Sequence, residues 1–95
     1  MPYLYLIFDV IKDKDTEKEL KDLNSSLTGI VDSHMDFGNI KFYLVGDTLL
    51  VIQDGGYRVS FRLLGSPKRV MDITNAFLQT FGKKLNLCAW DILWR

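Results

Sequence analysis

The sequence contains little cysteine, proline or histidine, and it has no excess of charge of either sign. Its 95 residues include one cysteine, two prolines and one histidine. The single thiol, Cys88, excludes an intrachain disulfide and a multi-cysteine metal centre, and it fits a reducing compartment such as the cytoplasm. Twelve basic residues balance twelve acidic ones, so we do not expect binding driven by general attraction to phosphate backbones or anionic membranes.

Long hydrophobic runs are also missing. No stretch approaches the ~18–20 apolar residues of a membrane-spanning helix. The apolar run over residues 3–11 contains Asp9 and lacks both a basic flank and a small-residue cleavage site, so we do not expect a signal peptide. With 47% apolar and 25% charged residues and no linker or repeat, the chain is expected to form a single soluble, cytoplasmic domain over residues 1–95.

Two segments have the pattern of amphipathic helices. The first is expected over residues 16–28, where Thr16 and Glu19 have the spacing of a capping box and leucines recur at helical intervals. The second begins after Ser66, with Pro67 at the first helical position, and ends at Gly82. Each helix has one apolar stripe, so each can cover only one face of a sheet.

Alternating side chains predict six strands. Three glycine-containing turns, Gly38-Asn39, Gly46-Asp47 and Asp54-Gly55-Gly56, separate the middle strands. The last strand carries Trp90 and Trp94, which are expected to anchor the core, with Trp94 partly exposed near the terminus. The strands are expected over residues 3–11, 31–37, 40–45, 48–53, 57–64 and 86–93.

The expected element order is therefore β-α-β-β-β-β-α-β. Two helices cannot cover both faces of such a sheet, so they should share one face and leave the other open. The predicted fold class is α+β, a two-layer sandwich of a mainly antiparallel sheet with two helices on one face. Its nearest architecture is a relative of the ferredoxin-like βαββαβ plan with an added hairpin, which by itself implies no function.

Turn lengths predict how the middle strands pair. The two-residue turns place His34 opposite Tyr43, and Tyr43 opposite Leu50. A three-residue turn over residues 54–56 places Gln53 opposite Tyr57, and therefore Leu50 opposite Ser60. This phase predicts a core face beneath the helices that consists of Val31, Met35, Phe37, Ile40, Phe42, Leu44, Leu49, Val51, Tyr57, Val59, Phe61 and Leu63.

The opposite face would then have an apolar centre with a charged rim. Asp32 and Asp36 lie on one side of it, Arg58 and Arg62 on the other, and apolar side chains stand between them. An exposed apolar patch with a charged rim is typical of an interaction surface. The predicted protein-binding residues are Tyr43, Leu50, Ile52, Arg58, Arg62, Asp32 and Asp36.

The sequence therefore predicts a small, non-enzymatic interaction or assembly module. Opposite charges on one patch would let two copies pair about a two-fold axis as a homo-oligomer, and the same face could instead bind a larger protein within a complex. The alternative function is binding of single-stranded RNA through the basic edge of this face. The residues predicted for RNA binding are Tyr5, Lys41, Tyr43, Arg58 and Arg62.

No pattern in the sequence indicates catalysis or a cofactor. Asp32, His34 and Asp36 alternate along one strand, and carboxylates with an imidazole can bind a divalent metal. One straight strand does not bring three side chains to ~2.1 Å from one ion, so no metal site is predicted, and Asp36 is expected to pair with Lys41. The sequence also lacks a nucleophile elbow and a phosphate-binding glycine loop, so we predict neither catalytic residues nor a small-molecule cofactor.

Overall fold

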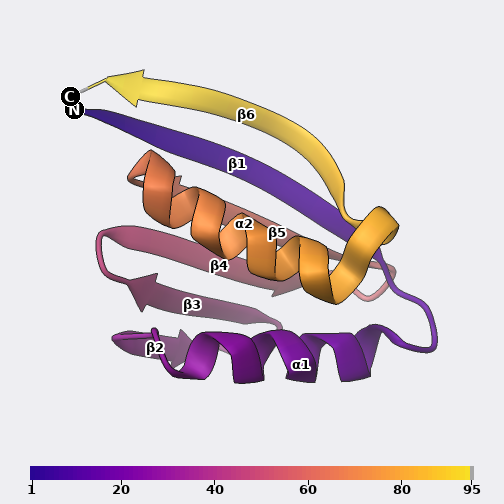
Figure 1. Cartoon of the computed structure of the whole chain (residues 1–95). Coiled ribbons are helices and arrows are strands. Elements are labelled where there is room, and N and C mark those ends of the chain that lie inside the picture. Colours follow the sequence, from indigo (N-terminus) through magenta and orange to yellow (C-terminus); the bar gives the residue numbers. More distant parts are fainter. Residues whose placement is uncertain (95) are drawn as a thin grey trace.

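A computed structural model describes residues 1–94, which form one six-stranded antiparallel sheet with two helices on one of its faces (Figure 1). This confirms the predicted fold class and element order. The elements are β1 (Pro2–Ile11), α1 (Thr16–Thr28), β2 (Ser33–Asp36), β3 (Ile40–Val45), β4 (Thr48–Asp54), β5 (Arg58–Gly65), α2 (Pro67–Phe81), a short 3-10 helix η1 (Gly82–Lys84) and β6 (Asn86–Trp94).

The strand order across the sheet is β2-β3-β4-β5-β1-β6. The first and last strands are neighbours, and Pro2 pairs with Trp94 (Figure 1). In Figure 1, α2 lies in front of β5 and α1 lies at the β2 edge, whereas neither helix lies in front of β6. The sheet therefore has one well-covered middle and one edge strand without a helix over it.

The helix ends largely follow the predicted signals. Ser66 is the N-cap of α2, Pro67 occupies its first turn, and Gly82 ends it with a positive φ of 57°, a backbone conformation that glycine adopts without strain. The predicted capping box of α1 is wrong. Asp15, not Thr16, is the N-cap, and Glu19 forms an ion pair with Lys84, which also pairs with Asp13 at 2.9 Å.

The core lies between α2 and the middle of the sheet. Phe61 of β5 has its ring centroid 4.9 Å from that of Phe77 and 5.4 Å from that of Phe81, both on α2. Phe8 of β1 meets Phe77 edge to face at 6.2 Å. Val59, Phe61 and Leu63 alternate into this core, as predicted, and none of the three is exposed to solvent.

The register of β4 against β5 differs from the prediction. Leu50 lies opposite Leu63 rather than Ser60, and Ile52 lies opposite Phe61. The reason is the turn: the Gly55 N–H donates to the Arg58 carbonyl at 2.9 Å, which leaves two residues at the tip, Gly56 and Tyr57. Gly56 has a φ of 86°, the positive φ that a two-residue hairpin turn requires.

The observed register of β4 against β5 differs from the predicted one by three residues. A shift by an odd number of residues exchanges the two faces of a strand. The pairings within β2, β3 and β4 are as predicted, so these three strands are inverted together relative to β5. Tyr43, Val45, Leu50 and Ile52, predicted to be exposed, face the helices. Eight residues predicted for the core lie instead on the open face or in the exposed turns beside it. They are Met35, Phe37, Ile40, Phe42, Leu44, Leu49, Val51 and Tyr57.

Two neighbouring leucines of β4 test this assignment. Leu50 is fully buried and Leu49 is exposed, so Leu50→Ala should lower the free energy of unfolding by about 2–5 kcal/mol. Leu49→Ala should cost about 1 kcal/mol or less, because it leaves no internal cavity. Urea denaturation at low protein concentration measures both changes. A larger loss for Leu49→Ala than for Leu50→Ala would contradict the observed register.

Candidate interaction surface

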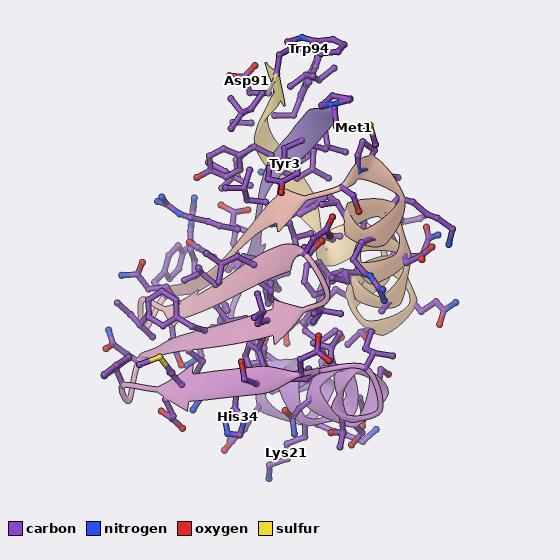
Figure 2. The ribbon with its side chains drawn as sticks, turned by 90° about the vertical axis from the view of Figure 1, so that its left-hand side faces the viewer. Met1, Tyr3, Lys21, His34, Asp91 and Trp94 are labelled. Atoms are coloured by element: carbon purple, nitrogen blue, oxygen red, sulfur yellow. The ribbon has the colours of Figure 1, made fainter. Side chains whose placement is uncertain are left out.

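The face of the sheet that points away from the helices carries a continuous group of apolar side chains. Figure 2 shows both helices on one side of the sheet and only side chains on the other. Met35, Phe37, Leu44 and Leu49 are exposed there, and their neighbours are half-buried. We call this group the open-face cluster, and it consists of Met35, Phe37, Ile40, Phe42, Leu44, Leu49 and Val51.

Strand pairing builds this cluster from three strands. Met35, Phe42 and Val51 stand side by side across β2, β3 and β4, because directly paired residues point to the same face. Leu44 and Leu49 form the neighbouring row. The ring of Phe37 meets that of Phe42 edge to face, with 5.9 Å between the centroids.

Two arginines of β5 border the cluster, as the sequence predicted, but they differ in their surroundings. Arg62 pairs with Val51 in the sheet and is exposed. Arg58 donates from Nη1 to Asp9 Oδ2 at 2.7 Å, and only 9% of the Asp9 side chain is exposed. Within residues 1–94, no ion pair involves Arg62. Arg58 therefore neutralises a nearly buried carboxylate, while the charge of Arg62 faces solvent.

The other predicted protein-binding residues are not on this face. Leu50 is fully buried, and Tyr43 and Ile52 are half-buried and contact the core. The prediction that these three residues share one exposed surface with Arg58 and Arg62 is wrong, because β3 and β4 are inverted relative to the predicted phase. An exposed apolar face exists, but a different set of side chains forms it.

The two predicted rim aspartates each have a structural partner in the sheet or its turns. Asp32 Oδ2 accepts a hydrogen bond from the Gly46 N–H at 2.7 Å. Asp36 pairs with Lys41 Nζ at 2.7 Å, as predicted, and its other oxygen accepts the Gly38 N–H at 2.9 Å. Lys41 first, and then the Gly38 amide, lower the pKa of the Asp36 carboxyl below its usual value.

The residues predicted for RNA binding are divided between the two faces. Tyr5, Arg58 and Arg62 point to the open face, whereas Lys41 and Tyr43 lie on the helix side. The ring of Tyr43 stacks with that of His34, with 6.1 Å between the centroids. The five predicted residues therefore do not share one surface, and Tyr5 is the only predicted aromatic residue on the same face as Arg58 and Arg62.

A groove of about 1060 Å³ lies on the helix side, between α1 and strands β2 to β4. Its walls mix apolar and polar groups, and the charged pair of Asp36 and Lys41 is part of the lining. In the part of the chain that the structure describes, no three His, Cys, Asp or Glu side chains are placed to hold a metal ion. The residues that line the groove include Leu20, Asn24, His34, Lys41, Tyr43 and Ile52.

A second apolar surface, which was not predicted from the sequence, lies on β6. Trp90 and Trp94, expected to anchor the core, are 64% and 77% exposed, and every described residue of β6 is exposed. The available signal was the count of helices: two helices cannot extend over all six strands, so one edge strand is left uncovered. Figure 2 places Trp94 and Asp91 at one end of the sheet and His34 at the other.

Comparison with known proteins adds no family to this description. No model of a known protein family matches the sequence, and no curated protein is similar enough to count as a relative. Neither helix in residues 1–94 is long and apolar enough to cross a membrane.

The two arginines of β5 should respond differently to truncation. Arg58→Ala leaves the Asp9 carboxylate nearly buried without its cation, so we expect a loss of about 1–3 kcal/mol in the free energy of unfolding. Arg62→Ala removes an exposed charge and should change it by about 0.5 kcal/mol or less. Thermal and urea denaturation at pH 7 measure both. Equal effects would mean that the ion pair of Arg58 with Asp9 contributes nothing.

The pair of Asp36 with Lys41 should make stability depend on pH in the acid range. Because the folded state lowers the pKa of Asp36 below 3.8, its contribution is present above pH 3.8 and is lost as the pH falls through the lowered pKa. Carboxyl-carbon NMR titration should give a midpoint below 3.8 for Asp36. Lys41→Met should move that midpoint upward, and an unchanged midpoint would exclude the lysine as the main cause.

Proposed function

We propose that this protein is a non-enzymatic assembly module that self-associates, with the open sheet face of one copy stacked on that of a second copy. The observation that carries the proposal is the open-face cluster: bulky apolar side chains from three adjacent strands, on a face that neither helix covers. A contiguous exposed apolar patch on a small domain is the usual sign of an interaction site.

The charges on this face favour a second copy as the occupant. Asp9 and Arg58 neutralise each other, and Arg62 and Asp91 carry opposite charges on the same face. The face as a whole therefore has no net charge and an apolar majority. Such a surface complements itself about a two-fold axis, whereas a face with net charge of one sign would repel its copy.

The dimensions of the face agree with this use. Six strands at a spacing of ~4.8 Å give a width of about 24 Å, and segments of six residues run about 20 Å. The flat area is thus roughly 480 Å², and protruding side chains raise the accessible area above that value. A stable dimer buries about 800 Å² on each partner, so the contact would have to use most of this face, not the cluster alone.

The proposal assigns no catalytic residue and no cofactor. The only histidine, His34, stacks on Tyr43, and the acids nearest to it in sequence, Asp32 and Asp36, are held by Gly46 and Lys41. RNA binding is not part of the proposal, because Lys41 and Tyr43 point away from Arg58 and Arg62. A cytoplasmic location is kept as part of it, since the single thiol of Cys88 has no disulfide partner in the chain.

A charge placed in the open-face cluster should break the association. Leu49→Glu puts a carboxylate on an apolar face that the second copy would cover, so we expect the dissociation constant to rise at least tenfold, equivalent to about 1.4 kcal/mol. Sedimentation at several concentrations should then show half the mass of the wild-type assembly. Circular dichroism should remain unchanged, because Leu49 is not part of the core.

Ile30→Glu provides the matched control. Ile30 is 43% exposed, close to the 38% of Leu49, but it follows α1 and lies outside β2 to β4. This variant should keep the wild-type mass. The proposal would be overturned if wild-type protein sedimented as a single chain at high micromolar concentration, or if both variants lowered the mass equally.

A further inference from the structure

The outer edge of β6 is a second unoccupied surface, separate from the open face. β6 is the last strand of the sheet, and each of its nine residues is exposed. The opposite edge strand, β2, has only four residues and carries His34 and Asp36. Long apolar edge strands associate with other strands, whereas short or charged edges resist it. Of the two edges, β6 is the one suited to pairing.

The backbone of β6 indicates which groups are available at this edge. The Ile92 N–H donates to Asp91 Oδ1 at 2.8 Å, in an exposed position, which places the Ile92 amide on the outer edge. Successive residues of an antiparallel strand turn their N–H and C=O groups to alternate edges. Trp90, Ile92 and Trp94 therefore present their main-chain groups outward, away from β1.

We propose that β6 pairs antiparallel with β6 of a second copy, which joins two six-stranded sheets into one continuous sheet. A two-fold axis brings the same strand of both copies together, so β6 has to be complementary only to itself. β6 contains one charged residue among those described, Asp91, and no proline that would remove an outward N–H. Pairing exchanges one existing hydrogen bond, because the outward Ile92 N–H now donates to Asp91 Oδ1 and would donate to the partner strand instead.

Asp91 determines the register. Pairing centred on Asp91 would place two carboxylates directly opposite each other, which is destabilising. The outward residues allow pairing centred on Trp90 or on Ile92 instead. Both arrangements place Asp91 opposite an uncharged residue of the partner strand, Ala89 in the first case and Leu93 in the second.

The second copy would also cover the tryptophans. Trp90, Ile92 and Trp94 lie on the helix side of the sheet, since they pair with Leu6, Leu4 and Pro2. A tryptophan can bury about 200 Å², so exposed fractions of 64% and 77% leave roughly 280 Å² to be covered. That is about a third of the ~800 Å² that each partner of a stable dimer buries.

One flank of α2 supplies more apolar surface beside this strand. Arg69 approaches Gly46, in the turn between β3 and β4, so this flank of α2 faces α1 and β3. Met71 and Leu78 lie on the opposite flank, toward β1 and β6, and are 45% and 48% exposed. In the joined sheet, the tryptophans of both copies would fill the space between the two α2 helices, with these side chains as its walls.

Engineered disulfides across the axis test the pairing directly. Residues opposite each other at a two-fold axis have Cα atoms about 5.5 Å apart, within the ~4.4–6.8 Å range of disulfides. In a Cys88→Ser background, either Trp90→Cys or Ile92→Cys should give a covalent dimer on oxidation with diamide. Leu87→Cys, whose exposed fraction lies between those of Ile92 and Trp90 but which is far from either axis, should not. Cross-linking of neither variant, or of Leu87→Cys as readily, would overturn the proposal.

A mass measurement separates this contact from the stacking of open faces. Ile92→Pro removes the outward N–H at the centre of the edge, and Leu49→Glu acts only on the open face. If both contacts form, each single variant should have half the wild-type mass, and the double variant should be a single chain. A wild-type mass for Ile92→Pro would overturn edge pairing alone, and a wild-type mass for Leu49→Glu would overturn face stacking alone.

Discussion

The register of β4 against β5 is the constraint on which the rest of the structure depends. The turn at Gly56 and Tyr57 places Leu50 opposite Leu63, and this one pairing decides the orientation of β2, β3 and β4 together. With it, Tyr43, Leu50 and Ile52 join the residues that contact the core. The same pairing turns Phe42, Leu44 and Leu49 to the open face.

The sequence was sufficient to predict the order of elements, because helix and strand patterns and their end signals are local. Pro67 and Gly82 mark α2 correctly, and the two-residue turns at Gly38 and Gly46 give the right pairings within β2 to β4. Which face of β3 and β4 is buried could not be predicted in the same way. Both faces of β3 and β4 are apolar, so their hydrophobic pattern does not reveal which one is buried, and the choice rested on the length of one turn.

The candidate surfaces exist because the sheet is wider than the layer formed by its two helices. Six strands span about 24 Å, whereas two packed helices span about 20 Å, since helices lie roughly 10 Å apart. One strand at the edge is left uncovered on the helix side, and the whole of the other face has no second layer. Predicting an exposed apolar face was therefore sound in outline, but the prediction assigned it the wrong residues and did not extend to Trp90 and Trp94 on β6.

Both tryptophans of the sequence lie on this single strand, which has a practical consequence for spectroscopy. Indole emission from this chain reports the surroundings of β6 and not those of the core, where the aromatic rings are phenylalanines such as Phe61 and Phe77. A denaturation curve recorded by fluorescence would follow the environment of the last strand, while far-ultraviolet ellipticity would follow the backbone as a whole. The two curves coincide only if that strand detaches together with everything else.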